Sequence, residues 1–252
     1  VPKAARCGDV ICGDIWGPFK PNLRNNFTYC AAFLDGHSGR GYVLPMQRKS
    51  EFLKTFEYLN QSILAPQGFP VKHFHTDSDA VMMSQHFRQY CTDHTISQSF
   101  SSPYSHWQNG LLERWTYTIK NKTIAALATC GLGEEWWFAC MRHSVDSHAL
   151  TPTRANPGQK SPHELMTGKP PTYDHLRVFG ADAYIRVENR RSREPRCEKG
   201  IFVGYSPEHP RGCYDVYCPR TGRIRQSRDV VVDETSVAPP SCSEWIRQWG
   251  LQ

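Results

Sequence analysis

The chain has 252 residues, which is enough for one large domain or two small ones. Hydrophobic residues make up 39% of it, and its longest uncharged helical segment, residues 123–133, is too short to cross a membrane. This composition argues against a membrane protein. The chain begins at Val1 without a signal pattern, so we expect it to be a piece of a longer protein.

The net charge of +6 arises between residues 177 and 228, where eleven Arg and one Lys stand against six acidic residues. The rest of the chain is neutral. A basic region beside a neutral one favours a polyanionic partner such as a nucleic acid. A basic surface that serves only solubility is the alternative.

Ten cysteines are scattered along the chain without a CxxC pair, and no pair of histidines stands near them at zinc-finger spacing. Most lie in apolar runs, so we expect buried free thiols in a reducing compartment and no zinc site. A bond between Cys213 and Cys218 within a hairpin is a disfavoured alternative.

The first hundred residues predict an α/β arrangement. Asp35 lies in the turn composition that separates two of the strands, so we interpret it as a turn residue rather than a ligand. Ser50 is expected to cap a helix with Phe52 and Phe56 on its apolar face. The order predicts a mixed sheet between helices. Strands are expected at 10–14, 27–34, 41–46, 71–76 and 96–100, and helices at 50–65 and 84–92.

Two long helices are expected next. Apolar residues recur at helical spacing from Leu112 to Cys130, and Gly131 is expected to end this helix. The second helix covers residues 134–150 and contains Trp136, Trp137 and Phe138. We interpret these aromatic residues as core rather than as a platform for stacking bases.

The last third changes to short strands, which indicates a small β-barrel. Strands are expected at 176–187, 200–205, 214–218 and 224–232, with a hairpin turn at 219–222. The predicted organisation is a core at 1–150, a connector at 151–176 with one helical turn at 162–166, a basic barrel at 177–235 and a tail at 236–252.

Three acidic residues stand where carboxylates are expected to be exposed. Asp14 and Asp77 each end a predicted strand, and Glu113 lies in the first turn of the long helix. Between them lie 62 and 35 residues. Any one of these residues alone is usually a turn or cap residue, so the spacing by itself is weak evidence.

The residues around these carboxylates strengthen the pattern. They read Gly-Asp-Ile-Trp-Gly-Pro at 13–18 and Pro-Tyr-Ser-His-Trp-Gln-Asn-Gly-Leu-Leu-Glu-Arg at 103–114, with later motifs at 175–180, 200–205 and 227–231. From about residue 8 to 235 the chain resembles the integrase of copia-type LTR retrotransposon Pol polyproteins. The resemblance implies a ribonuclease H-like core, a mixed five-stranded sheet flanked by helices, followed by an SH3-like β-barrel.

The resemblance also implies the chemistry. Asp14, Asp77 and Glu113 would be the catalytic residues and would hold two Mg²⁺ or Mn²⁺ ions, with Asp14 bridging them. Two such ions stabilise charge on the attacking and the leaving oxygen of a phosphodiester. The implied reactions are the trimming of cDNA 3′ ends and their transfer to target DNA, with water or a 3′-hydroxyl as nucleophile.

Eight residues are candidate DNA contacts. Tyr117 and Lys120 follow Glu113 at helical spacing, although a plain solvated Lys120 is an equal alternative. The others lie in expected loops, where such contacts are common: Tyr104, Asn109, Arg190, Arg191, Arg193 and Arg196. The resemblance further implies a homo-oligomer, a cytoplasmic particle before integration and the nucleus at that step.

One departure from the family pattern lies beside Asp77. The family usually continues with Asn-Gly-Gly-Glu, whereas this chain reads Ser-Asp-Ala-Val at 78–81 and so places a second acid, Asp79, near the site. This change puts activity in doubt, and two other functions stay open. One is a decayed or domesticated nucleic-acid-binding module of the same fold, and the other is a ribonuclease H-type nuclease.

Overall fold

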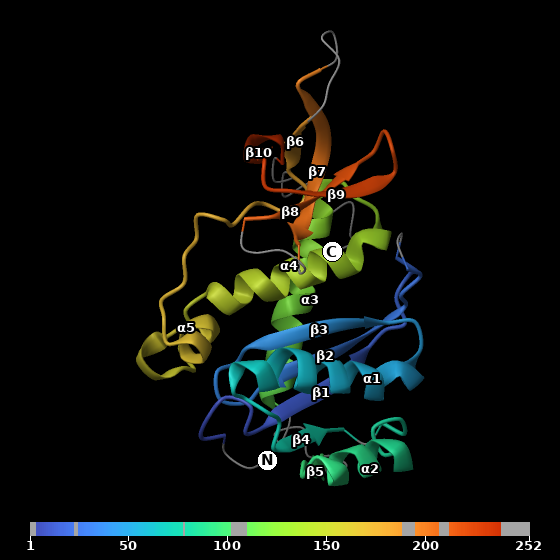
Figure 1. The fold of residues 1–252 in the computed structure, drawn as a ribbon, viewed down its shortest axis with the longest axis vertical. Coiled ribbons are helices and arrows are strands. Elements are labelled where there is room, and N and C mark those ends of the chain that lie inside the picture. The colour runs from blue at the N-terminus through green and yellow to red at the C-terminus, as the bar shows by residue number, and fades with distance from the viewer. Residues whose placement is uncertain are drawn as a thin grey trace, which may run out of the picture. The chain divides into compact units, whose positions relative to one another are not determined.

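The computed structural model describes residues 4–22, 25–77, 79–101, 110–187, 195–206 and 212–237 (Figure 1). The chain divides into two compact units. The first consists of Val1–Ile119 and Val145–Pro171, and the second of Lys120–Ser144 and Thr172–Gln252. The domain boundaries expected from the sequence stay predictions, and each unit is described by itself.

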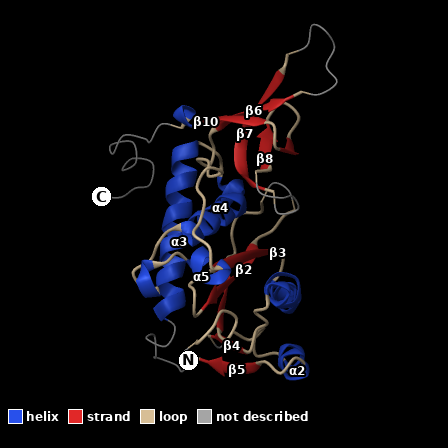
Figure 2. Ribbon diagram, turned by 60° about the vertical axis from the view of Figure 1, so that its left-hand side comes forward, coloured by secondary structure: helices blue, strands red, loops and turns tan. Residues whose placement is uncertain are grey.

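The first unit contains a five-stranded mixed sheet with the order β3-β2-β1-β4-β5 (Figure 1), and its strands are drawn in red in Figure 2. The first three strands are antiparallel, and β4 and β5 run parallel to β1. This arrangement confirms the predicted mixed sheet. The strands are β1 Ile11–Trp16, β2 Tyr29–Asp35, β3 Gly41–Met46, β4 His73–Thr76 and β5 Ser97–Phe100.

The turn between β2 and β3 is built on Asp35, whose side chain is fully buried. Its carboxylate accepts hydrogen bonds from the backbone of Gly8 and Ser38, both at 2.7 Å, and from the Ser38 hydroxyl at 2.7 Å. With its oxygens bound in this way, Asp35 holds the turn. The predicted structural role of Asp35 is confirmed.

The helix after β3 begins differently from the prediction. The chain leaves the strand directly into a 3₁₀ turn, Lys49–Glu51, so the N-cap position falls on Arg48 and Ser50 lies inside the turn. The prediction that Ser50 caps the helix was wrong. The helix continues as α1 Phe52–Tyr58, a π-helical segment Leu59–Leu64 and a 3₁₀ turn Ala65–Gln67.

The second helix, α2 Gln85–Asp93, begins as predicted, with the Ser84 hydroxyl accepting the Phe87 backbone N–H. Both helices pack on the sheet through aromatic rings. Neighbouring ring centroids in this cluster lie between 4.8 and 6.5 Å apart, which is the range of favourable aromatic contacts. The rings are those of Phe33, Phe52, Phe56, Phe74 and Phe87, all fully buried.

The long helix is α3 Gly110–Cys130, followed by Gly131 at φ +66°, so its predicted end is confirmed. After a 3₁₀ turn, Glu134–Trp136, comes α4 Trp137–Leu150, and α5 Pro162–Thr167 follows the Ser161 cap. The boundary between the units falls within α3 and within α4. Trp136 and Trp137 are buried, which confirms their predicted place in a core, whereas Phe138 is only half-buried.

The second unit contains an antiparallel sheet with the order β10-β6-β7-β8-β9. The predicted single strand at 224–232 was wrong, because it is two strands on opposite edges of this sheet. Only Arg228 and Asp229 connect them, so the sheet must curl until its edges approach, as in a barrel. The strands are β6 Asp182–Arg186, β7 Cys197–Tyr205, β8 Tyr214–Cys218, β9 Arg223–Ser227 and β10 Val230–Asp233.

The strand expected at 176–187 begins only at Asp182. Gly180, just before it, has φ +83°, which is outside extended conformations. The hairpin turn at 219–222 is present, with Gly222 donating its N–H to the carbonyl of Cys218. In the part of the chain that is described, no helix has the length and hydrophobicity needed to cross a membrane.

The described cysteines all have free thiols, including Cys213 and Cys218, as predicted. Most of them are buried, whereas Cys197 is exposed. Burial raises the pKa of Cys7, Cys12 and Cys91 to about 11. These thiols therefore stay protonated at neutral pH and behave as small apolar side chains.

Candidate active site

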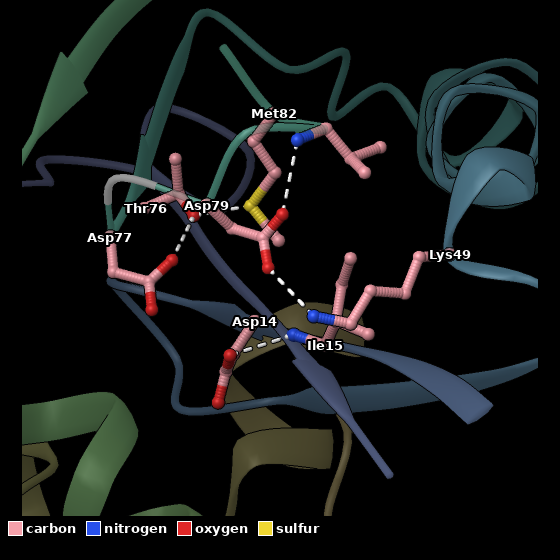
Figure 3. Close-up of polar contacts among 8 residues, drawn as sticks. Asp14, Ile15, Lys49, Thr76, Asp77, Asp79 and Met82 are labelled. Atoms are coloured by element: carbon pink, nitrogen blue, oxygen red, sulfur yellow. Dashed lines mark hydrogen bonds and ion pairs between the residues drawn. The ribbon is translucent and has the colours of Figure 1, made fainter. Parts of the chain in front are cut away.

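Asp14 and Asp77 are brought together by the register of two parallel strands. In β1 and β4, Cys12 pairs with His75 and Gly13 with Thr76, so Asp14 and Asp77 occupy the next matching positions. Neighbouring strands lie about 4.8 Å apart, and side chains at matching positions point to the same face of a sheet. Figure 3 shows both carboxylates beside one another at this point of the sheet.

The Asp14 carboxylate is half-buried and held by its own strand. One oxygen accepts the backbone N–H of Ile15 at 2.7 Å, and the other accepts the indole N–H of Trp16 at 3.0 Å. The Trp16 ring packs against Trp115 of α3 with 5.4 Å between centroids. Because residues two apart in a strand share a face, the start of α3 covers the face on which Asp14 lies.

Asp77 is exposed and follows the last residue of β4. Among the described contacts, its carboxylate accepts a long hydrogen bond, 3.5 Å, from the hydroxyl of Thr76. A carboxylate with few protein partners keeps its oxygens available to a cation or to water. Asp14 and Asp77 therefore offer hard oxygen donors of the kind that Mg²⁺ prefers.

Glu113 lies in the first turn of α3 and is exposed, two residues before the Trp115 anchor. The described residues contain no group of three or more His, Cys, Asp or Glu side chains that is arranged to hold a metal ion. The structure thus brings together two of the three predicted carboxylates and leaves Glu113 on the neighbouring helix. Its role as a third ligand stays a prediction.

A basic residue that the sequence did not single out lies beside this pair. Lys49 makes an ion pair with Asp79, 3.0 Å from Nζ to Oδ2. Partial burial alone would raise the pKa of Asp79, but the N–H of Val81 and the ammonium group of Lys49 lower it below its usual value. Asp79 is therefore ionised and already bound.

The candidate DNA contacts are only partly described. Tyr104, Asn109, Arg190, Arg191 and Arg193 lie outside the described residues. On α3, Tyr117 is 72% exposed and Lys120 is also exposed. Both lie on the same helix as Glu113, at the helical spacing that the sequence predicted. Arg196 is exposed just before β7. Their contacts with DNA stay predictions.

Part of the arginine excess of the second unit is bound to acidic residues. Glu198 accepts Arg220 at 3.2 Å and Arg225 at 2.8 Å, and Asp215 accepts Arg142 at 3.1 Å. Charges in such pairs attract a polyanion less than unpaired ones do. The arginines of these three pairs are therefore weaker candidates for contacts with phosphate.

Comparison with known families defines the class of protein. Residues 4–106 match the family described as "Integrase core domain", and residues 181–244 match "Retroviral polymerase SH3-like domain". The mixed sheet with Asp14 and Asp77 lies in the first match, and the antiparallel sheet lies in the second. Residues 4–106 thus match an integrase core and residues 181–244 match an SH3-like domain, as the motifs predicted.

Its relatives point to retrotransposons. Over 232 residues the chain is 25% identical to the Retrovirus-related Pol polyprotein from transposon TNT 1-94 of Nicotiana tabacum. This alignment covers 91% of this chain and 17% of that protein. Over 229 residues it is 27% identical to the corresponding polyprotein from transposon RE2 of Arabidopsis thaliana, 90% of this chain and 15% of that protein. The chain thus spans less than a fifth of these relatives, which are copia-type Pol polyproteins.

One solved structure supports the fold. It is the simian T-cell lymphotropic virus intasome in complex with PP2A regulatory subunit B56 gamma, studied by cryoEM. One of its chains aligns with a TM-score of 0.53 and 17% identity, covering 95% of this chain and 82% of that chain. The ribonuclease H-like core followed by an SH3-like region, predicted from the sequence, is confirmed.

Proposed function

We propose that this chain is the catalytic part of a retrotransposon integrase. It would trim the 3′ ends of the element's DNA and join them to target DNA, with Asp14, Asp77 and Glu113 holding divalent ions. The observation that supports this proposal is the parallel register of β1 and β4, in which Asp14 and Asp77 directly follow the paired residues Gly13 and Thr76. An integrase core match over residues 4–106 supports it.

The chain's own residues have limited roles in this reaction. When bound, two Mg²⁺ ions would stabilise charge on the attacking and the leaving oxygen of the phosphodiester. Asp14 and Asp77 supply oxygen ligands, and the indole N–H of Trp16 orients one oxygen of Asp14. The thiol of Cys12, two residues before Asp14, is buried and protonated, so it is no nucleophile. Water or a DNA 3′-hydroxyl would attack.

The remaining elements of the proposal concern partners. Exposed arginines such as Arg196 would track the DNA backbone, because guanidinium groups bind phosphate in a bidentate manner. Tyr117 and Lys120 would contact DNA from α3. The active form would be a homo-oligomer that works in the nucleus, after a stage in a cytoplasmic particle.

A second candidate function is a nucleic-acid-binding module that has lost catalysis. It is favoured by one observation: residues 78–81 read Ser-Asp-Ala-Val where the family usually has Asn-Gly-Gly-Glu. The rival ribonuclease H-type nuclease shares the acidic chemistry but needs no SH3-like domain.

A strand-joining assay separates these functions. The complete integrase region is incubated with a duplex that ends in the element's terminal sequence, in Mg²⁺ or Mn²⁺, beside an RNA–DNA hybrid. The proposal predicts joined DNA products that disappear in Asp77→Asn. DNA binding without products in either metal would favour the binding module, and digestion of the hybrid alone would favour the nuclease.

A further inference from the structure

The segment that follows Asp77 is organised around Asp79. The backbone carbonyl of Asp79 accepts the N–H groups of Met82 and Met83, and one oxygen of its carboxylate accepts the N–H of Val81 at 3.0 Å. Met82 is fully buried, and its sulfur contacts the hydroxyl of Thr76. The turn is therefore closed by Asp79 and anchored in the core by Met82.

The second oxygen of Asp79 binds a residue from another part of the fold. Lys49 lies in the 3₁₀ turn just after β3, and its ammonium group reaches Asp79 Oδ2 at 3.0 Å (Figure 3). Both carboxylate oxygens of Asp79 thus have partners. A metal ion would have to displace a cation to reach it, which argues against Asp79 as a ligand that replaces Asp77.

Asp77 itself needs such support. It follows a strand of only four residues, is exposed, and has a 3.5 Å contact with Thr76 as its described side-chain hydrogen bond. Its carboxylate depends on the chain on both sides for its position. On one side β4 is paired with β1. On the other side the Asp79 turn begins within two residues.

We propose that Lys49 and Asp79 form a positioning pair, which fixes the turn after β4 and so holds the Asp77 carboxylate beside that of Asp14 for metal binding. This inference rests on the proposed function, because it concerns the same metal site. Neither residue touches the ion. Partners outside the ligand set commonly orient a metal ligand in this way.

The test measures Mn²⁺ binding by the full chain. Electron paramagnetic resonance detects the Mn²⁺ that stays free in solution. The variants are Lys49→Met, Lys49→Arg, Asp79→Asn and the double variant of Lys49→Met with Asp79→Asn. Asp79→Asn keeps an oxygen for the N–H of Val81. The matched control is Lys72→Met, since Lys72 forms a similar exposed ion pair with Asp9 at 2.8 Å. Lys72 stands just before the first residue of β4, at the end of the strand away from Asp77.

We expect Lys49→Met and Asp79→Asn each to raise the Kd for Mn²⁺ roughly two- to fivefold, the range set by one partly exposed ion pair. The double variant should be no weaker than either single variant, and Lys49→Arg should stay near the parental value. Lys72→Met should change thermal stability at most. Removing the charge of Lys49 alone would tighten cation binding, so a weaker Kd separates positioning from a through-space charge effect.

Three outcomes would overturn the inference. An unchanged or tighter Kd in Lys49→Met would reduce the pair to a surface contact. A large loss in Asp79→Asn with none in Lys49→Met would make Asp79 a ligand. Unchanged binding in Asp77→Asn, measured alongside, would remove the metal site itself and with it the proposed function, whereas a failure confined to Lys49 and Asp79 would leave that function standing.

Discussion

The indole nitrogen of Trp16 donates a hydrogen bond to the carboxylate of Asp14, 3.0 Å away, while the same ring packs on Trp115 of α3. The tryptophan thus couples the orientation of a candidate metal ligand to the packing of a helix on the sheet. Trp115 in turn lies against Gly41 of β3. The orientation of the Asp14 carboxylate therefore depends both on its own strand and on the packing of α3.

Replacing Trp16 by Phe should weaken metal binding more than it weakens the fold. Phe keeps most of the ring packing but removes the donor to Asp14, and loss of such a partner costs about tenfold or more in metal affinity. The free energy of unfolding should fall by about 1 kcal/mol. The control is Trp115→Phe, because the Trp115 indole nitrogen has no hydrogen-bond partner among the described residues. Equal effects on Mn²⁺ affinity in both variants would contradict the role of Trp16.

Gly41→Ala should destabilise the first unit. A Cβ atom at this position would collide with the buried ring of Trp115, so the ring or the strand would have to shift. Overpacking of this kind costs about 1–3 kcal/mol, measurable by urea unfolding. Gly110→Ala is the control, since a Cβ there meets no atom within 4 Å. Equal stability of the two variants would show that α3 does not pack closely on β3.

Acid should destabilise the protein through His75. This residue is buried in β4, and its two ring nitrogens lie 2.8 and 3.2 Å from the hydroxyls of Ser99 and Ser101. Burial, the largest cause, lowers the pKa of His75 to about 4, against about 6.5 in an unfolded chain. The unfolded state therefore takes up the proton first as the pH falls.

The stability that the neutral ring contributes is present above pH 6.5 and is lost as the pH falls toward 4, at up to about 1.4 kcal/mol per pH unit. Urea unfolding between pH 7 and 5 measures this loss. The slope should be smaller in His75→Gln than in His86→Gln, because His86 is exposed on α2. Equal slopes in the two variants would assign the acid sensitivity to other groups.

The basic region should bind DNA without reading its sequence. Changing Arg190, Arg191, Arg193 and Arg196 to Gln should weaken binding equally on unrelated duplexes and lower the log–log salt slope by roughly 0.9 for each lost phosphate contact. Fluorescence anisotropy over a salt series measures both. A control with Arg220 and Arg225 changed to Gln should have less effect, since both pair with Glu198. An unchanged slope in the quadruple variant would indicate a structural or protein-docking role.

Much of this fold could be predicted because it follows from local patterns. The apolar spacing from Leu112 to Cys130 gave α3, and the turn composition after Asp35 gave its structural role. Such features depend on near neighbours in the chain. The same holds for the strand end before Asp77, whereas the predicted strand end at Asp14 was wrong, because β1 continues to Trp16. Only the paired register showed that Asp14 and Asp77 follow matching positions of β1 and β4.

The features that escaped prediction depend on distant contacts. The break at Arg228 and Asp229 exists because the chain moves to the other edge of the sheet, where the carbonyl of Asp229 accepts the N–H of Arg186. Hydrophobicity alone continues through this point, so it indicated one strand. The ion pair of Lys49 with Asp79 joins residues 30 positions apart and has no periodicity that would reveal it.

The central claim is that Asp14 and Asp77 together bind a divalent cation. The most direct measurement is the Kd for Mn²⁺ of Asp14→Asn and Asp77→Asn, beside Asp9→Asn, a change to an acidic residue that pairs with Lys72. We predict that the first two variants bind Mn²⁺ at least about tenfold more weakly at unchanged thermal stability, because each loses a charged oxygen ligand, and that Asp9→Asn binds as the parent does. Parental Mn²⁺ affinity in either Asp14→Asn or Asp77→Asn would contradict the account.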